Sequence, residues 1–295
     1  MCPVNLLLSI VGVIGVSASG PLMAWIAAPA LAIAFWRNAF GTAVLLPTAL
    51  TSSRRVELRA LDRRALAGTV FAGLMLAGHF ATWVSSLKLT SVASATALQA
   101  LQVAFVVLID RLRGHPVHKA VVVGLVVSSS GVLVVSGVDL TLSTRALVGD
   151  LLAVAGGVFA AAYVVTGGTM RQTLSTTAYT TLCYSTCALV LLACCLIGRQ
   201  PITGFDATTW LGLLAVTVSS QLLGHTIFNH LLAVVSPTVV SLVMLLEVPG
   251  AALLASVFLG QAPPVGVYAG LALILSGLVI VVLRQPSQHA EVPVD

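Results

Sequence analysis

The sequence is poor in charged residues. Only 8% of its 295 residues are Asp, Glu, Lys or Arg, and 58% are hydrophobic, whereas an ordinary soluble domain has about 25% charged residues. So few charges do not cover a water-facing surface, which excludes a soluble enzyme, a nucleic-acid binder and a disordered chain. The net charge of +5 therefore gives no reason to expect a nucleic-acid partner. Together with a mean hydropathy of +1.08, the composition predicts an all-α membrane protein.

The sequence also lacks the motifs of catalysis and of cofactor binding. It contains no P-loop, no Gly-x-Ser-x-Gly pattern and no Gly-x-Gly-x-x-Gly pattern. His115 and His118 are too few ligands for a metal site. The cysteines from Cys183 to Cys195 lie in one apolar stretch without a redox or metal spacing, which is typical of packing residues. We therefore expect no enzyme activity, no cofactor and no metal site.

Apolar runs long enough to cross a bilayer follow one another along the chain, separated by proline, glycine or polar residues. They predict ten transmembrane helices, with approximate bounds 4–27, 29–50, 65–87, 90–110, 116–136, 147–170, 175–198, 207–234, 236–260 and 263–283. The short links after the third and eighth spans predict tight helical hairpins. The predicted partners of these helices are membrane lipids; a small-molecule substrate is predicted from the internal repeat of the chain.

Lys and Arg are distributed unevenly over the predicted loops. Ten of them lie on the side that holds the arginine-rich loop 51–64, and three lie on the other side, namely Lys88, Arg145 and Arg199. Basic residues concentrate in cytoplasmic loops. The pattern predicts a multi-pass protein of the plasma (inner) membrane with both termini in the cytoplasm.

The two halves of the sequence match each other at a shift of 146 residues. Gly78 corresponds to Gly224, His79 to His225, and other glycines pair in the same register. Each half has five predicted spans, an odd number, so the second half crosses the membrane in the opposite direction. We therefore predict two inverted five-helix repeats, 1–140 and 141–284, with a cytoplasmic tail at 285–295. Inverted repeats are typical of transporters, whose site lies at mid-membrane between the halves.

The repeat register pairs glycine-containing sites in the first and sixth spans. Gly20-Pro21 corresponds to Thr166-Gly167. Helices broken at matching positions point to a substrate site because they free backbone groups. The alternative is that these residues only let neighbouring helices approach closely. In the fifth and tenth spans, the spacing Ala120-x-x-x-Gly124 and its counterpart predict close helix packing, within one chain or in a homodimer.

Two ionisable residues lie inside predicted spans. Glu247 is almost at the centre of the ninth span, where a charge is expensive. Its functional interpretation is a proton carrier or a ligand for a cationic group, and the alternative is a structural carboxylate, protonated or paired with Arg37. Arg37, in the second span, is suited to bind a substrate carboxylate, to join helices, or to reach the headgroups.

Polar side chains also form stripes along several predicted helices. His79 and Trp83 are four residues apart and so share a face, as do Gln221, His225 and Asn229. Facing a wet cavity would satisfy such groups, and so would hydrogen bonds to a neighbouring helix. The candidate substrate-binding residues are Arg37, His79, Trp83, Gln99, Gln102, Tyr163, Gln221, His225, Asn229 and Glu247.

The sequence resembles the EamA-type exporters of the drug/metabolite transporter superfamily over nearly its whole length. The resemblance is carried by the segments Ala34-Phe35-Trp36-Arg37, 87–95, 246–252 and 276–281. The chain departs from the family pattern where Val248 separates Glu247 from Pro249. It also departs where Gln261 and His115 stand at positions expected to be acidic.

The resemblance implies a ten-helix carrier that exports a small metabolite, such as an amino acid or a similar amphipathic compound, by alternating access. Uptake remains an alternative because residues do not give the direction of flux. A membrane enzyme acting on lipid-linked substrates is less favoured, because the sequence offers no nucleophile with a base. A scaffold that transports nothing would not need the inward polar stripes.

Overall fold

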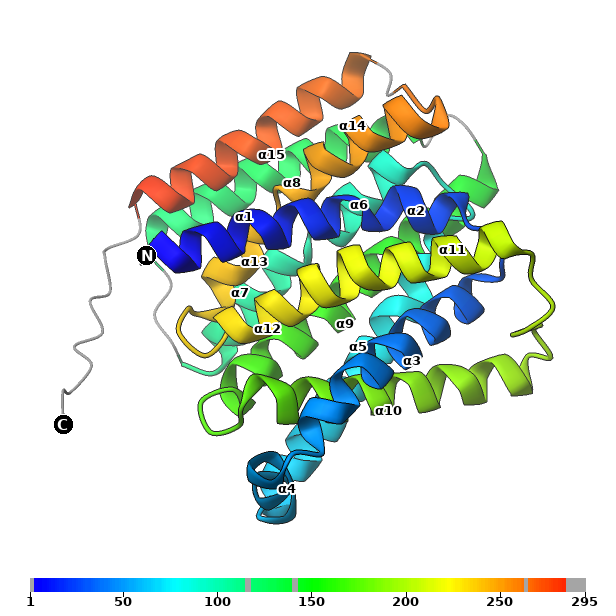
Figure 1. The fold of residues 1–295 in the computed structure, drawn as a ribbon. Helices are drawn as coiled ribbons and strands as arrows, with labels where there is room; N and C mark the ends of the chain where they lie inside the picture. Colours follow the sequence, from blue (N-terminus) through cyan, green and yellow to red (C-terminus); the bar gives the residue numbers. More distant parts are fainter. Residues whose placement is uncertain (1–2, 115–117, 140–142, 263–264, 285–295) are drawn as a thin grey trace.

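The computed structural model describes residues 3–114, 118–139, 143–262 and 265–284, and within them all regular structure is helical. The helices pack side by side in one bundle (Figure 1). The first half contains α1 (Pro3–Ser17), α2 (Ser19–Trp25), α3 (Ala30–Ala49), α4 (Ser52–Arg59), α5 (Arg63–Ser86), α6 (Val92–Gln99), α7 (Gln102–Leu112) and α8 (Lys119–Asp139). The second half contains α9 (Thr144–Met170), α10 (Thr176–Ile197), α11 (Ala207–Val216), η1 (Thr217–Thr226), α12 (Ile227–Leu231), α13 (Pro237–Met244), α14 (Glu247–Leu259) and α15 (Val265–Arg284). The predicted boundary at 140 and 141, the tail 285–295 and His115 lie outside the described residues.

Eight segments are long and apolar enough to cross a membrane. They correspond to eight of the predicted spans, and their ends agree to within a few residues. The predicted fifth and tenth spans correspond to α8 and α15, in which the described apolar stretches are shorter, Lys119–Val134 and Tyr268–Gly277. The all-helical membrane class is thus confirmed, and the count of ten spans stays a prediction.

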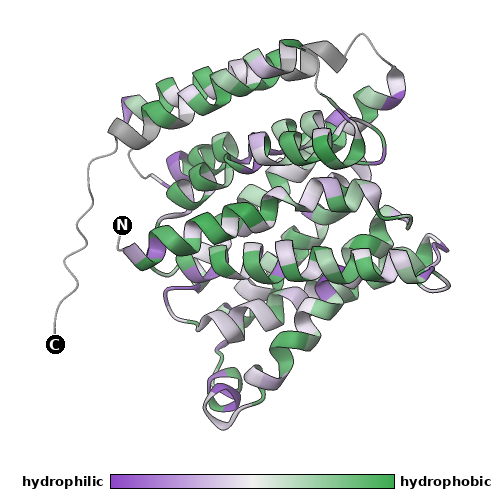
Figure 2. Cartoon of the chain, turned by 45° about the horizontal axis from the view of Figure 1, so that its top comes forward, coloured by the Kyte–Doolittle hydropathy of each residue, from purple (hydrophilic) through white to green (hydrophobic). Residues whose placement is uncertain are grey.

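Large apolar side chains are exposed around the outside of the bundle. Val257 is 67% exposed and Phe258 73% exposed, and hydrophobic residues run along the bodies of the helices while hydrophilic residues gather mainly near their ends (Figure 2). Phe80, Tyr184 and Leu213 are fully buried between the helices. Such an apolar exterior suits hydrocarbon rather than water.

The helix breaks differ from those predicted. The first span is interrupted at Ala18, between α1 and α2, two residues before the predicted Gly20-Pro21. The predicted break at Thr166-Gly167 is wrong, because α9 runs unbroken from Thr144 to Met170. A Cβ atom at Gly167 would lie 2.8 Å from the Tyr179 hydroxyl. That glycine therefore serves the close packing of a neighbouring side chain, which was the alternative interpretation.

Two breaks that the sequence analysis did not predict occur in the fourth and ninth spans. Residues 100–101 separate α6 from α7, and residues 245–246 separate α13 from α14. In the eighth span, η1 is a ten-residue π-helix. π-Helical segments inside α-helices are frequent at functional sites. All three irregularities adjoin polar side chains inside the membrane region.

The helices α8 and α15 approach each other through glycine, as the small-residue spacing predicted. A Cβ atom at Gly131 would lie 2.5 Å from the Gly270 carbonyl oxygen, and one at Gly277 would lie 2.4 Å from that of Gly124. Any larger residue would push these backbones apart. The predicted close packing is therefore confirmed, and it occurs within one chain.

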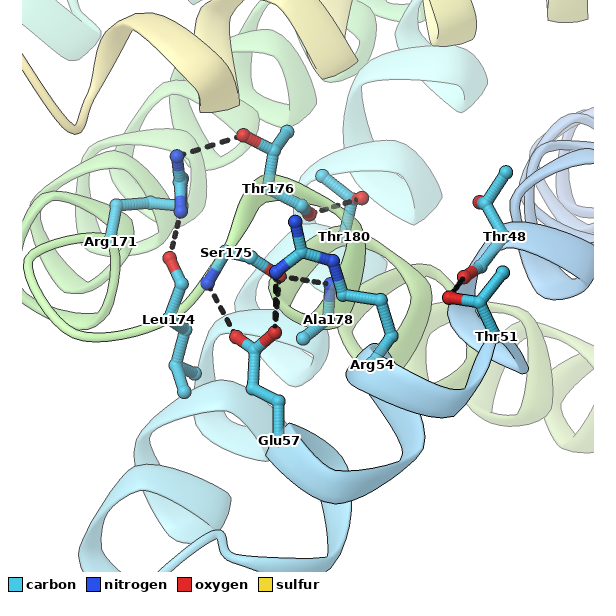
Figure 3. A network of polar contacts seen from close by, with 10 residues as sticks. All are labelled: Thr48, Thr51, Arg54, Glu57, Arg171, Leu174, Ser175, Thr176, Ala178 and Thr180. Carbon is cyan, nitrogen blue, oxygen red and sulfur yellow. Dashed lines mark hydrogen bonds and ion pairs between the residues drawn. The ribbon is translucent and has the colours of Figure 1, made fainter.

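Helix α4 lies at one end of the bundle (Figure 1) and is hydrogen-bonded to the residue before α10 (Figure 3). The Glu57 carboxylate accepts hydrogen bonds from the Ser175 backbone N, at 2.6 Å, and from Ser175 Oγ, at 2.7 Å. Arg54 Nη1 donates to the same carboxylate at 2.9 Å. Partial burial alone would raise the pKa of Glu57, but these hydrogen bonds outweigh it and hold the pKa below its ordinary value of 4.5.

Glu57→Gln is expected to lower the thermal unfolding midpoint in detergent at pH 7, because the charged acceptor at α10 is lost. The carboxylate is half-buried, so the effect is about 1 kcal/mol. Since the folded pKa is lowered, this stabilisation exists above the unfolded pKa and disappears as the pH falls through the folded pKa. The difference in thermal unfolding midpoint between the variant and the parent should therefore become smaller below about pH 4. An equal difference at all pH values would contradict a role for the charge.

Candidate functional site

A polar cavity lies inside the bundle, between helices of the two halves of the chain. Helices α5, α6 and α7 of the first half face α9, η1, α12, α13 and α14 of the second half. The predicted binding residues that line the cavity are His79, Trp83, Gln99, Gln102, Tyr163, His225, Asn229 and Glu247. Whether they bind a substrate stays a prediction, but the structure brings these eight side chains to one place.

Two predicted residues, Arg37 and Gln221, do not line the cavity. Both are fully buried. Arg37 Nε donates to Gln221 Oε1 at 2.9 Å, and Gln221 Nε2 donates to Asn38 Oδ1 at 3.0 Å. The Arg37 guanidinium carbon lies 4.2 Å from the centroid of the Phe80 ring. These contacts join α3 to α5 and η1, which corresponds to the helix-joining interpretation of Arg37.

The predicted stripe Gln221, His225 and Asn229 is divided between two surroundings. His225 and Asn229 line the cavity, whereas Gln221 contacts α3. Gln221 and His225 both lie in the π-helix η1, whereas Asn229 lies in α12. Spacing along one helix therefore did not mean shared surroundings, because Gln221 reaches α3 and His225 reaches the cavity. The amino-acid sequence offered no signal for this division.

Aromatic rings make up one part of the cavity wall. His79 stacks on Trp83, with ring centroids 5.5 Å apart and planes 14° apart. The His225 ring lies 6.4 Å from the rings of both His79 and Tyr163. The Nδ1 of His79 lies 3.0 Å from the Gly156 carbonyl oxygen, so Nδ1 is assigned as the donor and Nε2 is left as an acceptor.

The other polar groups in the wall divide into those with partners and those without. Gln99 Nε2 donates to Gln102 Oε1 at 2.9 Å, and the Tyr163 hydroxyl donates to Asn229 Oδ1 at 2.6 Å. Trp83 Nε1 is buried and has no hydrogen-bond partner. The Glu247 carboxylate forms no hydrogen bond or ion pair within the described ranges. Buried polar groups without partners are uncommon and mark positions where a ligand or water is expected.

The backbone breaks of the fourth and ninth spans lie beside this cavity. Gln99 ends α6 and Gln102 begins α7, while Glu247 begins α14. In the 146-residue register the break at 100–101 corresponds to 246–247, one residue from the observed break at 245–246. Pro249, which has no N–H to donate, was the one sequence signal for the second break. The sequence around the first break, at residues 100–101, contains no comparable signal.

Apolar residues complete the wall, and the sequence analysis did not single them out. They are Ala160, Val164, Phe228, Leu232, Val240 and Met244. In a chain that is 58% hydrophobic, such residues carry no distinguishing signal. Among the described residues, no group of three or more His, Cys, Asp or Glu side chains is arranged to hold a metal ion.

The free space inside the cavity is small. It amounts to about 20 Å³, which is room for about one water molecule, whereas ligand pockets commonly measure roughly 300–1,000 Å³. An organic solute does not fit unless the surrounding helices move apart. We call this closely packed arrangement the closed state.

A comparison with known proteins gives a separate family match for each half of the chain. A family model described as the EamA-like transporter family matches residues 4–137 and again residues 147–283. A crystal structure of another protein aligns with a TM-score of 0.72 over 95% of this chain and 96% of its own, at 20% identity, so this likeness bears on the fold alone. No curated protein matches significantly.

Proposed function

Because the chain belongs to the EamA-like transporter family, we propose that it is a secondary transporter that exports a small organic metabolite across the plasma membrane. An amino acid or a similar amphipathic solute is the substrate class that we favour. The observation that carries the proposal is the buried polar cavity between the two halves of the chain. Transporters built from repeats place their substrate site in such a position.

Alternating access through inverted five-span repeats is part of the proposal. Its support is the register of 146 residues, which relates the breaks beside Gln99 and Glu247 to within one residue. The small volume of the cavity is what a closed intermediate requires, since a carrier never opens to both sides at once. The excess of Lys and Arg on one side supports cytoplasmic termini.

The side chains of the cavity have distinct roles in this proposal. His79, His225, Gln99 and Asn229 form hydrogen bonds with the solute, and Trp83 provides an apolar or stacking wall. Glu247 sets the charge of the site or carries a proton. Arg37 and Gln221 hold α3 against η1. They do not contact the solute themselves and act only by positioning residues that do.

The test is a flux assay with the full chain in proteoliposomes, using a panel of radiolabelled amino acids with and without a pH gradient. We expect saturable flux of at least one solute above that of protein-free liposomes. His79→Ala and Gln99→Ala should each reduce this flux about tenfold, the equivalent of losing about 1.4 kcal/mol of interaction.

The matched control is Val126→Ala, which removes apolar atoms from a side chain that is 61% exposed on the outer face. This variant should transport like the parent at equal membrane abundance. Equal flux in the cavity variants and in the control would overturn the assignment of the cavity as the transport site. Absence of flux for the whole panel, in either direction, would count against transport of this substrate class.

A further inference from the structure

Glu247 is the acidic residue of the cavity wall, and its carboxyl group forms no hydrogen bond or ion pair with another described residue. The residue is 5% exposed and lines the cavity. Its carboxylate forms no ion pair with Arg37, whose guanidinium is bonded to Gln221 and to Ser19 Oγ instead. Buried charges are normally paired, and an unpaired charge in a membrane helix is expensive. A cation that enters the cavity would provide the missing partner.

The remaining wall offers acceptors and ring faces to such a cation. Nε2 of His79 accepts because Nδ1 donates to Gly156. Gln99 Oε1 is free to accept, since the hydrogen bond of this amide to Gln102 uses Nε2. The rings of Trp83 and Tyr163 border the same space, and aromatic faces attract ammonium groups.

Among the residues that the structure describes, no Lys or Arg side chain lines the cavity. Arg37 does not line the cavity, and its guanidinium lies over the Phe80 ring. Its positive charge acts on Glu247 through space without an ion pair. An anionic solute would therefore contact the Glu247 carboxylate but no Arg or Lys side chain of the described lining. Among the described residues that line the cavity, the buried donor without a hydrogen-bond partner is Trp83 Nε1, which suits an oxygen of the solute at some distance from an ammonium group.

We propose that the cavity takes solutes that carry an ammonium group, which pairs with the Glu247 carboxylate while Trp83 Nε1 donates to an oxygen of the same solute. This inference rests on the proposed function, since it assigns a substrate class to the cavity through which the solute passes. It includes zwitterionic amines, which use both contacts, and simple cationic amines, which use the ammonium contact alone, and it excludes neutral and anionic solutes of the same size.

The test compares four solutes that share one branched alkyl chain. These are leucine, 3-methylbutylamine, 3-methylbutanol and 4-methylpentanoate, added to the full-length protein in detergent. Binding is read as an upward shift of the thermal unfolding midpoint with increasing solute. The two amines should bind at least about tenfold more tightly than the alcohol and the carboxylate, because their ammonium group forms a charge-assisted hydrogen bond. Leucine binding more tightly than 3-methylbutylamine would support the role of Trp83 Nε1, and the reverse order would refute it.

Glu247→Gln should abolish the preference for amines. The control is Asp150→Asn, which removes a carboxylate from α9 that does not line the cavity and should leave the preference intact. Equal binding of the alcohol or the carboxylate to the parent, or an unchanged preference in Glu247→Gln, would overturn the inference. If the amines bind but none is transported in proteoliposomes, the proposed function fails while the binding site stands. If a solute without an ammonium group is transported, the substrate class fails while transport stands.

Discussion

Gly15→Val is expected to destabilise the protein severely and to disable the cavity. A Cβ atom at Gly15 would lie 2.4 Å from the carbonyl oxygen of Ser219 and 3.1 Å from the backbone N of Gly224. These are backbone atoms of η1, which do not move aside as a flexible side chain would. Overpacking commonly destabilises by about 1–3 kcal/mol, and a clash between backbones belongs at the upper end. Because η1 carries His225 into the cavity, any displacement of this helix also disturbs the site.

The measurements are the thermal unfolding midpoint in detergent and the flux of the reconstituted variant. The matched control is Ile14→Val, at the preceding residue of α1, whose side chain is 66% exposed on the outer face of the bundle. The control should unfold and transport like the parent. A Gly15→Val protein with parental stability would show that α1 and η1 separate freely, which would contradict their close packing.

Sequence reasoning succeeded for residues that contrast with their surroundings. His79, Gln99 and Glu247 are polar residues within long apolar runs, so their presence alone demanded partners or water. The structure places them around one cavity. The helical spans were equally accessible, because a bilayer requires about 20 apolar residues for each crossing. Both successes depend on the composition of single segments and not on how the segments pack.

The failures concern features that depend on the relation between helices. Gln221 and His225 have the spacing of one α-helical turn, yet Gln221 bonds to α3 while His225 lines the cavity. The break at residues 100–101 lies between two stretches of ordinary helix-forming residues. Gly167 suggested a broken helix, but its missing side chain makes room for Tyr179. Tertiary contacts decided each of these cases, and a single sequence contains no record of them.

Lys88→Met and Arg171→Met are expected to open the bundle at opposite ends and to reduce transport. Lys88 Nζ donates to the carbonyl oxygens of Ala24, at 3.1 Å, and of Ile26, at 2.7 Å, where α2 ends. Arg171 Nε donates to the carbonyl oxygen of Asn229 at 2.8 Å, and its other nitrogens bind the Leu174 carbonyl and Thr176 Oγ1. The end of α2 and the start of α10 lie at opposite ends of the bundle (Figure 1).

The two contacts occupy related positions in the repeat. Arg171 corresponds, at a shift of 146 residues, to Trp25, which lies between the two residues whose carbonyls bind Lys88. Each contact thus joins the first and third spans of its own half. In the first half the cation, Lys88, follows the third span, whereas in the second half the cation, Arg171, follows the first span of that half. Both are formed at once in the closed state. In the proposed alternating access, we expect one of them to open while the other stays formed, so the loss of either should favour opening at its own end.

A hydrogen bond to a charged group contributes about 1.5–3 kcal/mol, which corresponds to a change of tenfold or more in the ratio of two conformations. Hydrogen exchange should therefore become faster at residues 24–29 and 87–91 in Lys88→Met, and at 171–175 and 232–236 in Arg171→Met. Flux should fall in both variants, because each variant accumulates in one open conformation. Lys119→Met and Arg55→Met remove exposed cations of the same kinds and should change neither measurement. Faster exchange at both ends in each variant would show a general loss of stability and would contradict separate control of the two ends.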